Sequence, residues 1–177
     1  MNNAEKKLFL SKLKSENDEQ LLKTLDFFRN NGDTDVLVDV LRLLESERSQ
    51  SVYDCVLNIV SDLKNQAASD IAFEYMNQTS DLTAKRKMIS ALWQSDADFS
   101  HKAEVITNIF TSTNDFETAF EILTLLENNA CNINKNTANS LLDHISTQKK
   151  SAAAEFEGIY NAAIQHFYNI INGKEED

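Results

Sequence analysis

The chain has 177 residues, and 17 Lys plus Arg against 28 Asp plus Glu give it a formal net charge of −11. It contains three glycines and no proline, although turns in β proteins rely on both, so the composition argues against a β sandwich or barrel. The apolar fraction of 42% is enough for a buried core, which argues against an acidic disordered chain.

Apolar residues recur at helical spacing along nearly the whole chain, and Ser, Asp or Asn precedes many of the runs, as expected at helix N-termini. The pattern predicts about ten helices, over residues 3–14, 18–30, 34–46, 51–64, 67–77, 82–94, 99–110, 115–128, 136–147 and 151–171. The short polar stretches between them suit connections between antiparallel neighbours. The Asn-rich segment 128–139 is expected to form a loop.

The predicted helices form pairs, and the pairs repeat. The second helix of each pair is expected to follow an N-cap at Asn17, Ser51, Asp81, Asp115 or Ser151. The eighth residue after each of these caps is apolar, namely Leu25, Ile59, Ile89, Leu123 and Ile159. The ends of the first helices are spaced by 31 to 35 residues. A regular period with one helical hairpin in each unit is the signature of an α-solenoid.

Residues 37–63 and 103–126 show the repeat most clearly, because an apolar first helix leads through a polar turn into an apolar second helix. Acidic residues occupy the turns at Asp18, Asp81 and Asp115. These units resemble HEAT repeats of the short bacterial kind, although the usual turn proline is missing and the basic residue early in the second helix occurs only as Lys85-Arg86. Tetratricopeptide and ankyrin repeats fit less well, because the sequence lacks their proline and glycine signatures.

The resemblance implies an all-α fold, a right-handed α-α superhelix of about five helical hairpins. We expect one HEAT-like domain over residues 1–173 and a short acidic tail over residues 174–177. The first helix is polar, as suits a cap. The last, residues 151–171, is long and aromatic, and it either caps the other end or forms a homodimer interface.

Cys55 and Cys131 are expected to be reduced thiols that serve as small apolar residues in helices. No apolar run approaches the length of a membrane span, and the N-terminus lacks the pattern of a signal peptide. We therefore expect a cytoplasmic protein that does not associate with a membrane.

No constellation of catalytic residues is evident. His101, His144 and His166 lack the spacing of a metal-binding helix, and three scattered glycines cannot form a phosphate loop. We expect a protein without enzymatic activity, cofactor or metal. A family of DNA glycosylases resembles the HEAT fold, but its members bind DNA through a strongly basic face. The net charge of −11 therefore disfavours this alternative and nucleic-acid binding in general.

In HEAT-like solenoids the second helices usually line the concave surface. Positions six and ten after each cap are expected to face away from the core, and several of them hold large apolar residues beside charged ones. The predicted partner-binding residues at these positions are Lys23, Phe27, Leu57, Lys87, Glu121 and Leu125. Arg86, at the otherwise apolar fifth position, is added as a basic residue able to bind a carboxylate or phosphate. Two other interpretations stay open: the apolar members pack between adjacent repeats, and Arg86 pairs with an acid of a neighbouring unit.

The sequence favours an adaptor or scaffold that binds another protein along its second helices, and a basic protein is one kind of partner that the acidic charge would suit. The alternative is an acidic inhibitor or immunity-type protein that masks a basic toxin or nuclease, because its charge would steer such a partner.

Overall fold

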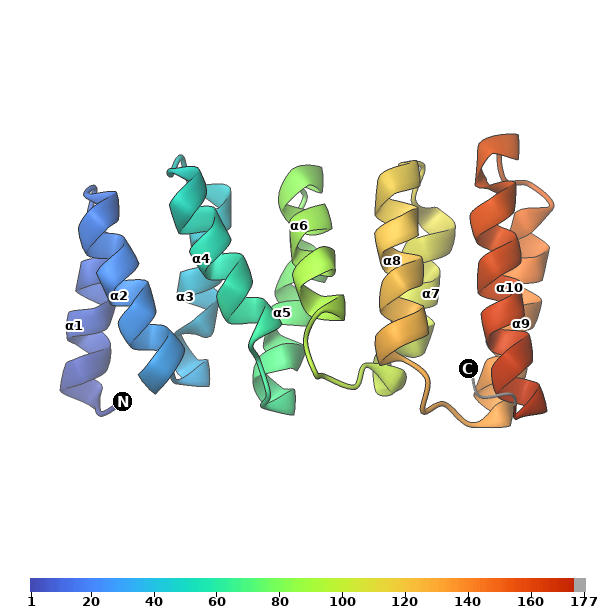
Figure 1. Ribbon diagram of the computed structural model, residues 1–177, viewed down its shortest axis with the longest axis horizontal. Helices are drawn as coiled ribbons and strands as arrows, with labels where there is room; N and C mark the ends of the chain where they lie inside the picture. Colours follow the sequence, from blue (N-terminus) through green and yellow to red (C-terminus); the bar gives the residue numbers. More distant parts are fainter. Residues whose placement is uncertain (174–177) are drawn as a thin grey trace. The chain divides into compact units, whose positions relative to one another are not determined.

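A computed structural model describes residues 1–173, and these residues contain only helices, turns and loops, with no strand (Figure 1). The predicted acidic tail, residues 174–177, lies outside the described residues. The chain divides into two compact units, residues 1–97 and a second unit that begins at Asp98. The expectation of a single domain stays a prediction.

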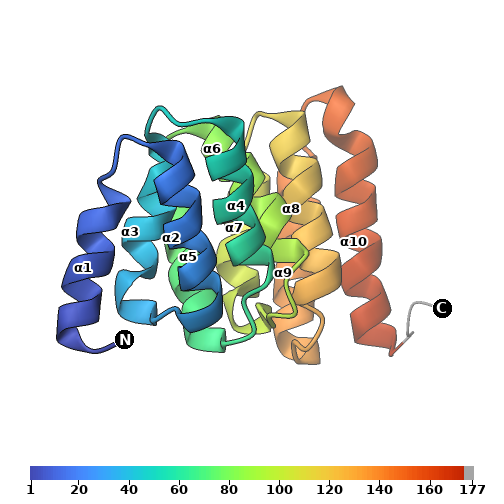
Figure 2. The same ribbon diagram turned by 60° about the vertical axis from the view of Figure 1, so that its left-hand side comes forward.

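The first unit consists of three helical hairpins. Its elements in chain order are α1 (Asn3–Leu13), α2 (Asp18–Asn31), η1 (Thr34–Val36), α3 (Leu37–Leu41), η2 (Arg42–Glu45), α4 (Gln50–Ser61), α5 (Gln66–Gln78) and α6 (Leu82–Trp93). Within this unit α2 packs against α4 and α4 against α6, while α1 contacts α3 and α3 contacts α5 (Figure 1). First helices therefore form one layer and second helices another, and Figure 2 shows the same two rows from the side.

The second unit consists of two further hairpins. Its elements are η3 (Ser100–Lys102), α7 (Ala103–Ser112), α8 (Phe116–Asn129), α9 (Lys135–Lys149), η4 (Ala154–Phe156) and α10 (Glu157–Asn172). The helices α7 and α8 pair, α9 and α10 pair, and the two hairpins meet through contacts of α7 with α9 and of α8 with α10. Within residues 1–173 the five predicted hairpins are thus confirmed.

Side-chain caps explain where several helices begin. Asn17, Asp81 and Asp115 accept hydrogen bonds from the first-turn amides of α2, α6 and α8, which confirms three of the five predicted caps. The caps predicted at Ser51 and Ser151 are wrong. The helix α4 begins two residues earlier, with Ser49 as N-cap. The Ser151 hydroxyl donates to the Gln148 carbonyl oxygen at 3.0 Å, so this residue closes the end of α9 instead of opening the next helix.

The repeat-defining apolar positions lie in the core. The eighth-position residues are all buried, with exposed fractions from 0 to 7%: Leu25, Ile59, Ile89, Leu123 and Ile159. Phe73 in the first unit and Phe167 in the second are fully enclosed. Stacked hairpins bury these side chains against neighbouring repeats, as a solenoid requires.

The aromatic last helix contributes mainly to the core of its own unit. Phe156, Tyr160 and Phe167 are buried, and Phe110 of α7 packs on Tyr160 with ring centroids 5.0 Å apart. Tyr168 remains 52% exposed. A homodimer through this helix stays a prediction.

Two details of the second unit correct the sequence interpretation. Cys55 and Cys131 form no disulfide with each other, as predicted, but Cys131 is exposed and does not serve as a small apolar core residue. The Asn-rich loop is shorter than predicted, because α8 continues to Asn129 and α9 begins at Lys135. The Asn134 side chain accepts a hydrogen bond from the Thr137 amide at 2.9 Å and thereby starts α9.

Replacing a fully buried aromatic ring tests the assigned core. Phe73→Ala should lower the free energy of unfolding by about 3–5 kcal/mol, because it leaves a cavity in the first unit. Phe120→Ala is the matched control, since this ring is 55% exposed and its loss should change the free energy by less than about 0.5 kcal/mol. Urea unfolding followed by circular dichroism measures both. Similar losses for the two variants would contradict the core assignment.

Candidate functional site

The hairpin of α1 and α2 leaves two large apolar side chains at its surface. Successive residues of a helix point about 100° apart, so neighbours in sequence face different directions. Phe9 and Phe28 turn inward and stack with ring centroids 5.4 Å apart. Leu8 and Phe27 turn outward and are 57% and 48% exposed. The hairpin therefore buries one apolar stripe and exposes the edge of another.

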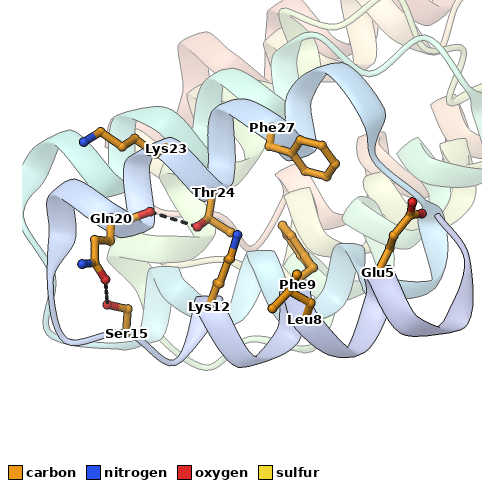
Figure 3. A pocket seen from close by; sticks show the side chains of 9 residues that line it. All are labelled: Glu5, Leu8, Phe9, Lys12, Ser15, Gln20, Lys23, Thr24 and Phe27. Carbon is orange, nitrogen blue, oxygen red and sulfur yellow. Dashed lines mark hydrogen bonds between the residues drawn. The ribbon is translucent and has the colours of Figure 1, made fainter.

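Between the two helices lies a groove with a volume of about 510 Å³ (Figure 3). Its lining residues are Glu5, Leu8, Phe9, Lys12, Ser15, Gln20, Lys23, Thr24 and Phe27. Figure 3 shows Leu8, Phe9 and Phe27 together in its middle, Glu5 toward one end, and Lys12 and Lys23 on the other side of the apolar cluster. The groove thus combines an apolar centre with charged ends, a composition found in protein-recognition surfaces.

The charge around the groove differs from that of the whole chain. The helix α1 holds Lys6, Lys7 and Lys12, with Lys14 at its C-cap, against a single acid, Glu5. Lys23 forms an exposed ion pair with Glu19 one turn earlier, at 2.8 Å. Lys12 is exposed and forms no ion pair within residues 1–173. Basic side chains therefore predominate on α1, whereas α2 carries Asp18, Glu19 and Asp26 against Lys23 and Arg29.

Ion pairs fix the position of α1 relative to the next hairpin. The Lys6 ammonium lies 2.9 Å from a carboxylate oxygen of Asp33 and also pairs with Asp35. Asp33 in turn accepts a hydrogen bond from the Asp35 amide at 3.1 Å and caps η1. These interactions, the Lys6 hydrogen bond first, lower the pKa of Asp33 to about 2. The wall of the groove formed by α1 is held in place by this cluster.

The predicted partner-binding residues divide between the two units. Lys23 and Phe27 line the groove. Leu57, Arg86 and Lys87 are half-buried on α4 and α6. The Lys87 ammonium lies 5.5 Å from the centroid of the Tyr53 ring on α4, so this side chain connects adjacent second helices.

In the second unit the residues predicted to bind a partner, Glu121 and Leu125, do not form an exposed surface. Leu125 is only 1% exposed, which corrects its assignment to an accessible face. Its helix α8 packs against both α7 and α10, so the tenth position points into protein. Glu121 is half-buried. The exposed apolar residues of α8 are instead Phe116 and Phe120, at 44% and 55%.

Sequence reasoning missed Leu8 and Lys12, which complete the groove. Both lie in the helix that was interpreted as a polar cap. The sequence did contain an indication of this. Leu8 and Lys12 are four residues apart and therefore share one face of the helix, next to the buried face of Phe9 and Leu13.

The described residues offer no evident metal or membrane site. Within residues 1–173 there is no group of three or more His, Cys, Asp and Glu side chains placed to hold a metal ion. The helices of the same range include none with the length and apolarity of a bilayer span.

Residues 86–166 match a family model described as pentatricopeptide repeat-containing protein. Comparisons with curated proteins and with solved structures give no match. The matched stretch runs from α6 into α10, through the hairpins of the second unit. Together with the all-helical fold it supports a solenoid of helical repeats, although it does not single out HEAT repeats. Repeats of this kind typically form binding scaffolds for macromolecules.

The Asp33 cluster should make the stability of the first unit depend on acid pH. Because the folded pKa is about 2 and the reference value is 3.8, Asp33 stabilises the fold above pH 3.8, and this contribution is lost as the pH falls toward 2. Asp33→Asn should lower the urea midpoint of unfolding near neutral pH. It should also make this midpoint decline less steeply as the pH falls from 3.8 to about 2. Asp96→Asn, at an exposed residue, should follow the wild-type curve. Parallel curves for all three proteins would contradict the role of Asp33.

Proposed function

We propose that the protein is a non-catalytic binding scaffold that engages a partner protein through the α1–α2 groove. The observation that carries this proposal is the exposure of Leu8 and Phe27 in one groove, at 57% and 48%. Exposed apolar residues gathered in a hollow and bordered by charges are typical of recognition surfaces. The proposal retains Lys23 and Phe27 from the predicted binding set, with Leu57 and Arg86 as its extension along the second helices.

RNA is the main alternative partner, because pentatricopeptide repeats read RNA bases. RNA binding requires cationic side chains that neutralise phosphates. Residues 98–173, which include most of the matched stretch, contain four lysines and no arginine against nine acidic residues. This balance supports a protein partner over RNA.

The acidic inhibitor remains a second candidate, and the net charge of −11 favours it. A basic toxin or nuclease would be attracted by the overall field, and its association would slow steeply with added salt. A partner held mainly by apolar contacts would show a weak salt dependence. The salt dependence of the association rate therefore separates the two candidates.

Disrupting the groove should abolish partner binding without unfolding the protein. We expect Phe27→Asp and Leu8→Asp to lose a partner that the wild type retains in affinity capture, with unchanged helical circular dichroism. Phe120→Asp is the matched control, since it adds the same charge at an exposed ring of α8. Retention of the partner by the groove variants, or equal loss in the control, would contradict the proposal.

Direct RNA binding should be weak. We expect no retention of a mixed-sequence single-stranded RNA by the wild-type protein in a gel-shift assay at physiological salt, because few cations are available on the second unit. Retention that decreases with salt and persists in Phe27→Asp would contradict the assignment of a protein partner and favour RNA.

A further inference from the structure

The charged residues that line the groove between α1 and α2 restrict which ligands fit it, beyond the requirement for apolar side chains. Its apolar centre, formed by Leu8, Phe9 and Phe27, is bordered by Lys12 and Lys23, with Glu5 toward the opposite end (Figure 3). A ligand that fills the centre must place its own charges against these ends. The groove therefore constrains the direction of a bound segment as well as its apolar content.

We propose that this groove binds an acidic amphipathic helix of a partner protein. In this arrangement apolar side chains of the partner helix insert between Leu8 and Phe27, and carboxylates one turn further along reach Lys12 and Lys23. The inference rests on the proposed scaffold function and adds the chemistry of the partner.

The shape of the groove favours a helix over an extended strand. Its α1 wall runs from Glu5 to Lys12, about two helical turns, or roughly 10 Å. Both walls are helices, and neither presents an unpaired strand edge for β-augmentation. On its other side the same hairpin already packs against helices, through contacts of α1 with α3 and of α2 with α4. A helix seated on the outer side would bury Leu8 and Phe27 by the same side-chain interdigitation.

The lysines favour a partner helix with acidic residues. Lys12 is exposed and forms no ion pair within the described part of the chain. Lys23 pairs with Glu19, but both side chains are more than 70% exposed, at 74% and 78%, and such surface pairs contribute little. Both ammonium groups are therefore available to partner carboxylates. The lining residues at this end of the groove include these two lysines and no acid, so an acidic segment is attracted there.

The test selects ligands from a display library of helical peptides, about four turns long, with randomised positions on one face. The library is panned in parallel against the full-length wild type, the charge-reversed variant Lys12→Glu/Lys23→Glu, and Phe27→Asp. Circular dichroism checks that each variant is folded, which is expected because all three side chains are exposed. Binding of the enriched peptides is then measured on all three proteins.

We expect wild-type protein to enrich peptides with a pair of apolar residues followed one turn later by Asp or Glu. Their affinity should fall about tenfold or more on the charge-reversed variant and be lost on Phe27→Asp. The charge-reversed variant should enrich Lys- or Arg-containing peptides instead. An absence of peptides that prefer wild type to Phe27→Asp, or enrichment without an acidic bias, would overturn the inference.

Two further outcomes would also overturn it. A concentration-dependent dimer that Phe27→Asp abolishes would show that a second copy of the chain occupies the groove. A captured partner that requires Phe27 and Leu8 but is unaffected by Lys12→Glu/Lys23→Glu would leave the scaffold function standing and reject the acidic helix. Failure of the inference is thus distinguishable from failure of the proposed function.

Discussion

Burial of each hairpin against its neighbours is the constraint on which the rest of the structure depends. In the first unit the hairpin of α3 and α4 is flanked by α1–α2 and by α5–α6. Many of its apolar side chains are consequently fully buried, with Val40, Leu41 and Val52 at 0% exposure. The hairpin of α1 and α2 packs on α3 and α4 through one side only, and the residues on its other side, Leu8 and Phe27, stay exposed. The groove follows from the repeat architecture itself.

Polar contacts at both ends of the first two hairpins give this groove a defined geometry. Near the N-terminus of α1, Lys6 pairs with Asp33. At the other end Asp18, the first residue of α2, accepts a hydrogen bond from the Ser49 amide at 2.8 Å and pairs with Arg48 at 3.4 Å. These contacts connect the hairpin to the next one independently of the apolar core. A groove with fixed walls loses little conformational entropy when a ligand binds.

Much of the fold was predictable because helical periodicity and capping are local properties. The spacing of apolar residues predicted helices whose bounds agree with the structure within a few residues. It also placed Leu25 and Ile89 in the core, where both are buried. Predictions failed where a choice depended on neighbours. Ser151 resembles a helix cap in sequence, yet its hydroxyl bonds back to α9. Cys131 was expected in a helix, yet it is exposed after the end of α8.

The candidate site shows the same division. The sequence by itself determined the helices, their pairing with a period of 31 to 35 residues, and the unusual position of Phe27 outside the apolar stripe. It did not determine which outward residues remain accessible, because Leu125 occupies the same repeat position as Phe27 and is buried, in a helix that packs against α7 and α10. Only the tertiary structure decided this, since the exposure of a helix face depends on whether another hairpin packs against it.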